Sequence, residues 1–240
     1  MALLEMHYFS TTLRECSSMD VVVPESGLAC AGKMPVLWLL PPVGMDHTAW
    51  RRHAVVEELA ERFRVIAAMP DMRLSFGADM VHGEPYQALL TQELPGVLER
   101  YIPADLSRQL LFGAKEGGYA ALRAALLHPQ AYMAACGADC GCVTRMTWQG
   151  RKAVWASWAF GTEDTQSLRG TNYDLAALAE RCGDSPRLFL YAGEDAEYAQ
   201  AGRLLLLEAP RIREIAAQGA GWAAWSQALS AFLELTVPRA

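Results

Sequence analysis

Apolar residues along the chain fall into short uninterrupted runs that are separated by stretches of mixed composition. A run such as Val36–Leu40 is typical of a strand that is buried on both faces. A stretch such as Tyr119–Leu127, rich in Ala and Leu, is typical of a helix. The predicted strands are Leu3–Phe9, Met19–Val23, Val36–Leu40, Arg64–Met69, Gln109–Phe112, Ala131–Cys136, Arg187–Tyr191 and Arg211–Ala216. The predicted helices are Ala54–Arg62, Tyr86–Tyr101, Tyr119–Leu127, Leu175–Arg181, Glu197–Glu208 and Trp222–Leu235.

The order of these elements predicts the fold class. Strands that alternate with helices indicate an α/β protein with a mostly parallel sheet and helices on both of its faces. Glu25–Lys33 is expected to form a turn, and Gly137–Thr171 is expected to be irregular. Pro95 should disturb the helix that contains it. Because no linker or repeat divides the sequence, we expect one domain over residues 1–240.

Composition narrows the classes of function. The chain has 240 residues, of which 52% are hydrophobic and 20% charged, enough for a large core. Lys and Arg number 21 against 27 Asp and Glu, a net charge of −6. Binding to a phosphate backbone depends on clustered basic side chains, so we expect no nucleic-acid partner.

Hydropathy along the chain argues against a membrane protein. No apolar run approaches the roughly 18 residues that span a bilayer. The first residues lack the basic start and long apolar stretch of a signal peptide. We therefore expect a cytoplasmic protein with no membrane partner.

Three of the six cysteines cluster as Cys136, Cys140 and Cys142. The usual spacing of a zinc site would require a fourth nearby ligand, which this segment lacks. We interpret the three as small residues at a strand end and in the following loop. No metal and no cofactor is expected.

One short motif carries candidate chemistry. Gly113-Ala114-Lys115-Glu116-Gly117 lies between a predicted strand and a predicted helix, which is the setting of a nucleophile elbow. Glycines suit such a turn because it is tight and the backbone of its central residue is strained. The third position of the motif, where a serine nucleophile would stand, holds Lys115.

With this motif in place, the chain from Leu3 to Leu235 resembles the esterase D and tributyrin esterase branch of the α/β-hydrolases. The resemblance implies an α/β-hydrolase fold with a small cap-like segment at about residues 138–172. It also implies that the chain would be classed among carboxylic-ester hydrolases. The segments that carry it are Pro35–Gly44, Asp46–Trp50, Met69–Phe76, Ala78–Met80, Glu93–Leu98, Gly113–Tyr119, Tyr191–Asp195 and Gly219–Trp225.

The chain departs from this family at positions that matter for catalysis. The resemblance aligns Lys115 with the family's serine, Asp195 with its acid and Ala220, or the neighbouring Gly221, with its histidine. The last of the five histidines is His128, so the final loop cannot supply a base. Because triad members act as a unit, we expect no intact catalytic triad.

The loop that would hold the oxyanion has also changed. The family's His-Gly is replaced by Pro41-Pro42, ahead of Val43, and proline has no N–H to donate. The N–H of Glu116, just after the elbow, is the donor that we expect to survive. Each oxyanion donor contributes about 10²–10³ in rate, so this change alone should be costly to ester hydrolysis.

Each candidate residue has a structural interpretation and a functional one. We expect Lys115 and Asp195 to form an ion pair in the former active site; nucleophilic Lys115 and catalytic Asp195 are the alternatives. Glu116 fits the first turn of a helix, with an acid–base role as its alternative. The structural interpretation of His47 and His53 is a surface or hydrogen-bonded position. That of Cys136 is a small buried residue. Three tryptophans in the cap-like segment are expected to pack there, or else to line a ligand pocket or an interface: Trp148, Trp155 and Trp158.

The leading hypothesis is an esterase-family protein without serine hydrolase activity that binds a small-molecule ligand or a partner through the former pocket. A second hypothesis is an enzyme of altered chemistry that uses Lys115, Glu116 and Asp195. A third is a structural subunit that forms homo-oligomers or pairs with an active paralogue.

Overall fold

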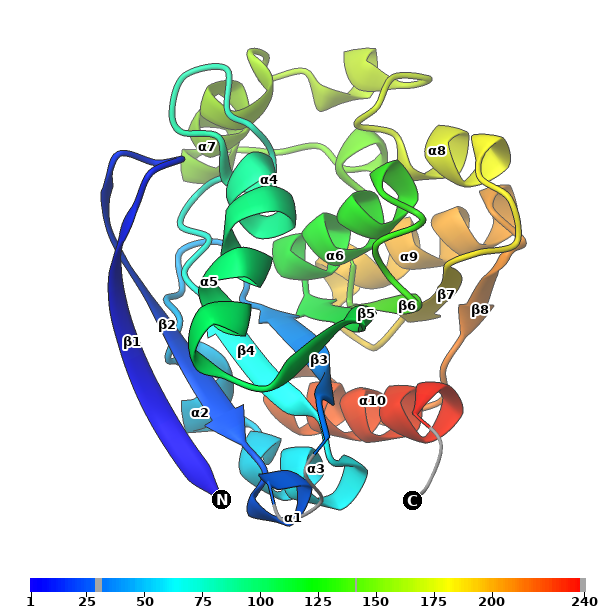
Figure 1. Cartoon of the computed structure of the whole chain (residues 1–240). Coiled ribbons are helices and arrows are strands. Elements are labelled where there is room, and N and C mark those ends of the chain that lie inside the picture. The colour runs from blue at the N-terminus through cyan, green and yellow to red at the C-terminus, as the bar shows by residue number, and fades with distance from the viewer. Residues whose placement is uncertain (29–31, 141, 238–240) are drawn as a thin grey trace.

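A computed structural model describes residues 1–28, 32–140 and 142–237. Its strands and helices alternate as the sequence predicts (Figure 1). The strands are β1 Ala2–Ser10, β2 Glu15–Val23, β3 Met34–Leu40, β4 Ile66–Pro70, β5 Ala104–Ala114, β6 Ala134–Ala138, β7 Arg187–Tyr191 and β8 Ile212–Glu214. The α-helices are α1 Glu25–Leu28, α2 Ala49–His53, α3 Val56–Phe63, α4 Tyr86–Ala88, α5 Leu94–Tyr101, α6 Glu116–Leu127, α7 Arg151–Phe160, α8 Leu175–Arg181, α9 Ala196–Glu208 and α10 Gly221–Thr236. A π-helical segment, η1 Leu89–Glu93, joins α4 to α5, and 3-10 turns lie at η2 Val143–Arg145 and η3 Thr165–Leu168.

The strands form one sheet in the order β1-β2-β4-β3-β5-β6-β7-β8. β1 pairs with β2, and β2 with β4, in antiparallel fashion. Every later pairing, from β4–β3 to β7–β8, is parallel. The predicted α/β fold with a mostly parallel sheet is therefore confirmed.

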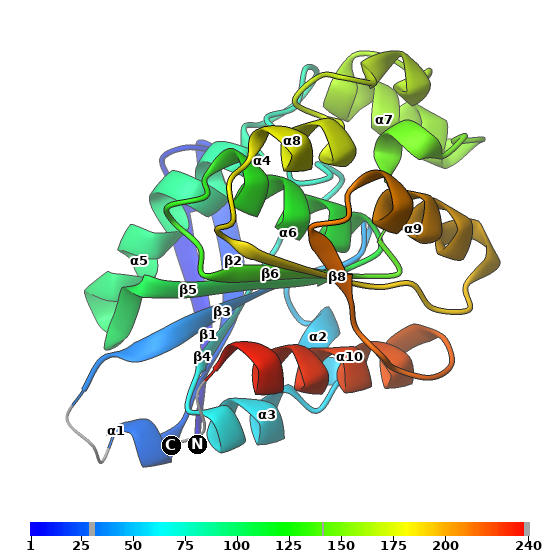
Figure 2. The same cartoon turned by 90° about the vertical axis from the view of Figure 1, so that its right-hand side faces the viewer.

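Two apolar layers enclose the sheet, one on each face. Alternate residues of β3 point to opposite sides: Val36 and Trp38 join one core cluster, and Leu37 and Leu39 join the other. α3 and α10 cover the second side, whereas α5, α6, α8 and α9 cover the first (Figure 2). Burial on both faces explains why β3 reads as an unbroken apolar run.

Some predicted boundaries are wrong. The segment expected to be irregular contains α7, which places Ala153, Ala156 and Ala159 inward at helical spacing. The helix predicted at 54–62 is α3, which runs from Val56 to Phe63, and α2 is a further short helix before it that was not predicted. β5 begins at Ala104, five residues before the predicted strand, and β6 begins three residues later than predicted.

The N-terminal segment also differs from the prediction. Residues 25–28 form α1, where a turn was expected. Part of that expected turn, with Cys30, lies outside the described residues. Within the described ranges, no helix combines the length and apolar content that crossing a bilayer requires.

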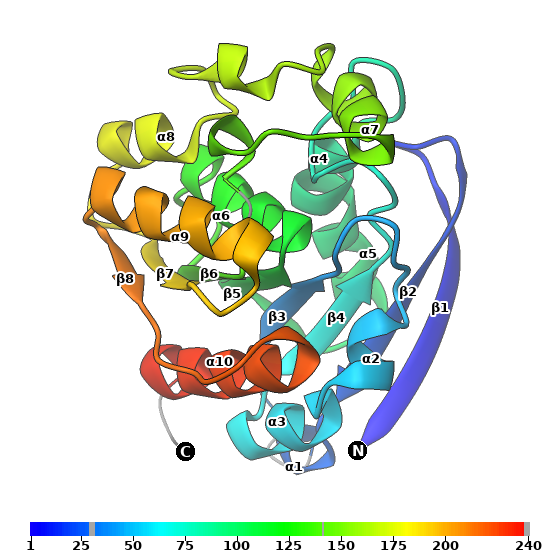
Figure 3. The same ribbon diagram turned by 180° about the vertical axis from the view of Figure 1, so that it is seen from behind.

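Parallel pairing brings several strand ends to one edge of the sheet. β3, β5, β6 and β7 all run in the same direction and end at Leu40, Ala114, Ala138 and Tyr191. The residues that follow these ends therefore gather above the same edge, beneath α7 and α9, as the view from behind shows (Figure 3).

Candidate functional site

Lys115 occupies a strained turn between β5 and α6. Its φ is 53° and its ψ −119°, a left-handed conformation that costs a non-glycine residue about 1–3 kcal/mol. Its N–H donates to the carbonyl of Ala138 at 2.8 Å. A Cβ on Gly113 would lie 2.2 Å from the carbonyl oxygen of Gly117, so the turn requires glycine there. The predicted elbow geometry is confirmed.

The Lys115 side chain crosses the site to the loop after β7. Its Nζ lies 2.9 Å from Oδ2 of Asp195, which confirms the predicted ion pair. The ammonium also lies 4.7 Å from the centre of the Tyr198 ring. Both side chains are about a quarter exposed, at 26% and 28%. Because both charges are partly buried, dissolved salt screens this ion pair less than a pair on the surface. The ion pair therefore holds the lysine side chain in place.

Glu116, the first residue of α6, is buried beside this pair. The Tyr198 hydroxyl donates to its Oε1, and the Val43 N–H donates to its Oε2 at 3.4 Å. The predicted first-turn position is confirmed, but the carboxylate reaches the oxyanion loop, which the sequence did not indicate. Because that carboxylate accepts from Val43, it lies where a loop N–H would otherwise meet a ligand oxygen.

Pro41 and Pro42 are both buried between Glu116 and the end of β3. A Cβ on Gly117 would lie 2.4 Å from the carbonyl oxygens of Leu40 and of Pro41. The elbow helix and the proline loop are therefore in direct contact. The loop presents carbonyl oxygens to the helix start, and its two prolines add no N–H.

Lys152, from α7, is a further charged residue of the site. Its Nζ lies 2.7 Å from the Tyr198 hydroxyl and 3.7 Å from Oε1 of Glu116. It also lies 5.5 Å from the centre of the Trp148 ring. No sequence pattern places Lys152 or Tyr198 here, because α7 itself was not predicted and Tyr198 lies in a helix distant along the chain.

Asp139, directly after β6, is a second residue that sequence reasoning missed. It is 1% exposed, and its carboxylate accepts from Trp225 Nε1 at 2.7 Å and from the Gly193 N–H at 2.9 Å. Burial raises its pKa, against the lowering effect of these two hydrogen bonds. The sequence does contain a signal for this residue, because Asp139 is an acidic residue shortly after a predicted strand that ends at the same sheet edge as the elbow. Asp139 fixes the loop that presents Asp195.

Ala220 lies at the start of α10, between Gly219 and Gly221, both of which have positive φ. The residue is exposed, and its methyl group cannot accept or donate a proton. The Tyr191 hydroxyl donates to the Gly219 carbonyl at 2.6 Å and anchors this loop beside β7.

The other candidates lie in supporting positions. Nε2 of His47 is 3.8 Å from Asp20, and the ring of His53 stacks on Trp222 with centroids 4.9 Å apart. Cys136 is fully buried, and burial raises the pKa of its thiol well above the ordinary value. Cys140 and Cys142 are also buried. Among the described residues, no group of three His, Cys, Asp or Glu side chains is placed to hold a metal ion.

The three cap tryptophans have different surroundings. Trp148 is buried and meets Phe76 edge-on, with ring centroids 5.7 Å apart. Trp155 is half-buried and comes within 3.8 Å of the Cβ position at Gly44. Trp158 is 42% exposed and lines an open cleft. Packing accounts for the first, whereas the third faces solvent.

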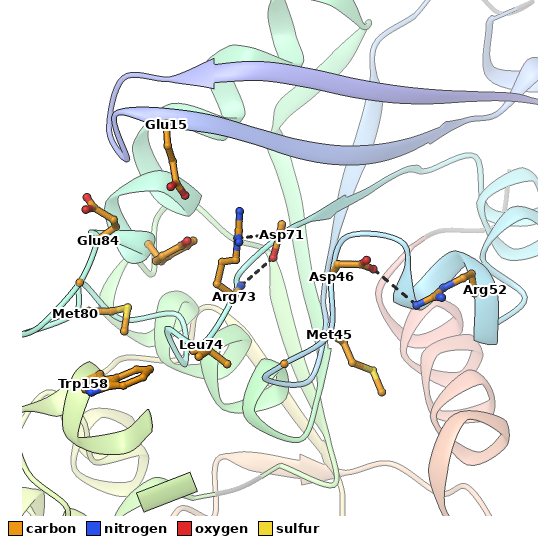
Figure 4. Close-up of a pocket in the computed structure, with 13 residues that line it drawn as sticks. Glu15, Met45, Asp46, Arg52, Asp71, Arg73, Leu74, Met80, Glu84 and Trp158 are labelled. Carbon is orange, nitrogen blue, oxygen red and sulfur yellow. Dashed lines mark hydrogen bonds and ion pairs between the residues drawn. The ribbon is translucent and has the colours of Figure 1, made fainter. Parts of the chain in front are cut away.

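Arg73 lines two cavities of very different size. A cavity of about 10 Å³ lies beside Glu116, between Val43 and Arg73. A much larger cleft of about 610 Å³ opens on the far side of Arg73 (Figure 4). The elbow cluster thus holds two ammonium groups, two carboxylates and a phenol in mutual contact.

Comparison with known proteins gives a consistent result. A family model described as "Putative esterase" matches residues 18–231. FphF, a fluorophosphonate-binding serine hydrolase of Staphylococcus aureus, superposes with a TM-score of 0.83 at 20% identity, over 99% of this chain and 98% of that one. An S-formylglutathione hydrolase of Agrobacterium tumefaciens gives 0.82 at 18% identity, over 99% and 95%. MPT51 of Mycobacterium tuberculosis gives 0.79 at 16% identity, over 100% and 99%. No curated protein sequence matches the chain.

Proposed function

Because the chain belongs to the esterase family and has the α/β-hydrolase fold, we propose that it keeps this fold without serine hydrolysis and acts by binding a ligand or partner. The observation that carries the proposal is the elbow itself. Lys115 stands at the strained position, and its ammonium is bound to Asp195 at 2.9 Å. An ammonium held in this way has no lone pair with which to attack an ester carbonyl.

Two further features support the proposal. No histidine follows His128 in the sequence, and the loop that starts α10 offers Ala220, so this loop supplies no histidine base to activate a nucleophile. The Glu116 carboxylate accepts the Val43 N–H, and a negative charge there repels the oxyanion of a tetrahedral intermediate. Each feature alone would slow ester hydrolysis. Together they remove the histidine base and the oxyanion stabilisation on which the rate of a serine esterase mainly depends.

A fluorophosphonate probe tests the proposal. Such probes bond covalently to an activated serine, so we expect no added mass on this protein in intact-mass spectrometry. FphF, which binds fluorophosphonates, is the positive control. Stoichiometric labelling of the chain at neutral pH, abolished by substitution of a single serine or of Lys115, would contradict the proposal.

The convergence of Lys115, Lys152, Glu116 and Tyr198 favours a second candidate, an enzyme of altered chemistry. A lysine that lost its proton to a neighbouring carboxylate could attack a carbonyl carbon and release water, leaving an imine. Borohydride would reduce that imine to a stable secondary amine. A pH-dependent adduct on Lys115 or Lys152 after incubation with a small aldehyde, above that on surface lysines, would favour this candidate.

A further inference from the structure

The large cleft beside the elbow is a separate site with its own chemistry. It lies between the turn of the β1–β2 hairpin, the loop after β3 and the segment from Asp71 to Tyr86, with Trp158 of α7 at one end (Figure 4). Its volume of about 610 Å³ falls in the range of small-molecule sites. Its lining includes Glu15, Glu84, Tyr86, Met80 and Trp158.

The walls of this cleft are held by contacts outside it. The Glu93 carboxylate accepts from the Ser10 hydroxyl at 2.7 Å and from the N–H groups of Thr11 and Thr12 at 2.8 and 2.9 Å, which fixes the hairpin turn next to Glu15. On the opposite wall, the Val81 and His82 N–H groups donate to carbonyls of α7 at 3.1 and 2.9 Å. The cleft is therefore preformed, which lowers the entropic cost of binding.

Tyr86 is a polar residue that the protein itself does not satisfy. It is only 5% exposed, yet its hydroxyl makes no hydrogen bond with any of the described residues. Its pKa is raised, first by burial and then by the charges of Glu15, Asp71 and Glu84, against the opposing charge of Arg73. All four of those charged residues line the cleft, so the hydroxyl faces the same space. The hydroxyl therefore lies at the surface of the cleft, where a ligand or water can hydrogen-bond with it.

The charges of the cleft do not balance. Asp71 is paired with Arg73 at 3.2 Å, and Asp46 with Arg52 at 3.9 Å. Glu15 and Glu84 form no ion pair or hydrogen bond through their carboxylates with the described residues. Figure 4 shows these two at the same end of the cleft, away from Asp46 and Arg52. Arg73 lies near them but is paired with Asp71, so Glu15 and Glu84 give this end of the cleft a net negative charge.

Apolar groups lie next to these charges. The Trp158 ring, 42% exposed, and the thioether of Met80 line the same end of the cleft. An exposed indole face attracts cations and packs against hydrocarbon. The end of the cleft thus offers two carboxylates, one unpartnered hydroxyl and an aromatic wall.

We propose that this end of the cleft binds a small organic cation, a primary ammonium on an apolar chain, whose N–H groups donate to Glu15, Glu84 and the Tyr86 hydroxyl. The hydrocarbon part packs on Trp158 and Met80. The proposal goes beyond the proposed function and holds whether or not the elbow performs chemistry. None of the five cleft side chains belongs to the elbow cluster.

Calorimetric titration of the whole protein with hexylamine tests it. We expect saturable binding at neutral pH that is tighter than binding of hexanol or hexanoate. Glu15→Gln and Glu84→Gln should each weaken binding of hexylamine by about tenfold, and Tyr86→Phe by about fivefold. Matched controls on exposed residues away from the cleft, Glu58→Gln and Tyr101→Phe, should leave the affinity unchanged. Thermal unfolding of each variant reports whether it has folded.

Several outcomes would overturn the proposal. They are the absence of saturable binding with hexylamine, equal or tighter binding of hexanoate, and unchanged affinity in the three folded cleft variants. Equal binding of hexyltrimethylammonium, which has no N–H, would refute the donation to Tyr86. A free amine and a lysine side chain present the same ammonium group. Tighter binding of a lysine-containing tripeptide than of hexylamine would assign the site to a peptide, and weaker binding to a free amine.

Discussion

Lys115 combines two functions in one residue, a strained backbone and an anchored charge. Its positive φ is expensive for any residue with a Cβ, and its ammonium is fixed by Asp195. A serine at this position would gain reactivity from the turn. The lysine instead uses its length to reach across the site. The strained turn therefore presents an ammonium group that is paired with Asp195.

The backbone strain can be measured apart from the ion pair. Lys115→Ala and Lys115→Gly both remove the ammonium, but glycine tolerates a φ of 53° and alanine does not. We expect Lys115→Gly to have a higher free energy of unfolding than Lys115→Ala, by about 1 kcal/mol, in urea denaturation. Inside α6 the order should be the opposite, so that Ala121→Gly is less stable than the wild type with its alanine, because glycine weakens a helix. A less stable glycine variant at position 115 would show that the turn is not strained.

Restoring the serine should not restore hydrolysis. In Lys115→Ser the hydroxyl would have no base, because Ala220 cannot accept its proton. We expect no saturable hydrolysis of p-nitrophenyl acetate by this variant, and poor activity even with Ala220→His added, since Pro41 and Pro42 remain. Robust turnover by the single variant would mean that another residue serves as the base.

Among the elements, the β1–β2 hairpin depends on one carboxylate. Burial alone would raise the pKa of Glu93, but hydrogen bonds from Thr12, Ser10 and Thr11 outweigh it and lower that pKa to about 2, from an ordinary value of 4.5. A carboxylate with a depressed pKa stabilises the fold above its unfolded pKa. That contribution is lost as the pH falls from about 4.5 towards 2.

We therefore expect the difference in free energy of unfolding between the wild type and Glu93→Gln to become smaller as the pH falls from about 4.5 towards 2. Chemical denaturation at a series of pH values measures it. Glu99→Gln, on the same helical segment but exposed, is the control and should show a much smaller change. A difference that stays constant from pH 5 to pH 2 would show that the ionised carboxylate does not hold the hairpin.

The success of prediction from sequence varied with how each element is buried. Val36–Leu40 was predicted because a strand covered on both faces has no polar positions. α7 was missed because its inward positions are small alanines and Trp158 points outward, so its pattern lacks an apolar stripe. β5 was predicted too short because its first half carries partly exposed polar residues.

For the molecule as a whole, the sequence predicted the elbow and its ion pair but not the cluster around them. Lys115 and Asp195 could be paired because both follow strands that the resemblance aligned. Lys152 and Glu116 meet through Tyr198, which is 82 positions from Glu116, and such contacts depend on the packing of α7 and α9 onto the sheet. The cleft at Tyr86 likewise joins three segments that no local pattern connects.

From the esterase-family fold and the lysine at the elbow we infer that this site does not hydrolyse esters. Steady-state hydrolysis of p-nitrophenyl acetate tests it most directly, with the wild type measured beside Lys115→Ala. We expect a slow rate that rises linearly with substrate, matches the background of surface lysines and is the same in both proteins. Saturable turnover by the wild type that disappears in Lys115→Ala would contradict it.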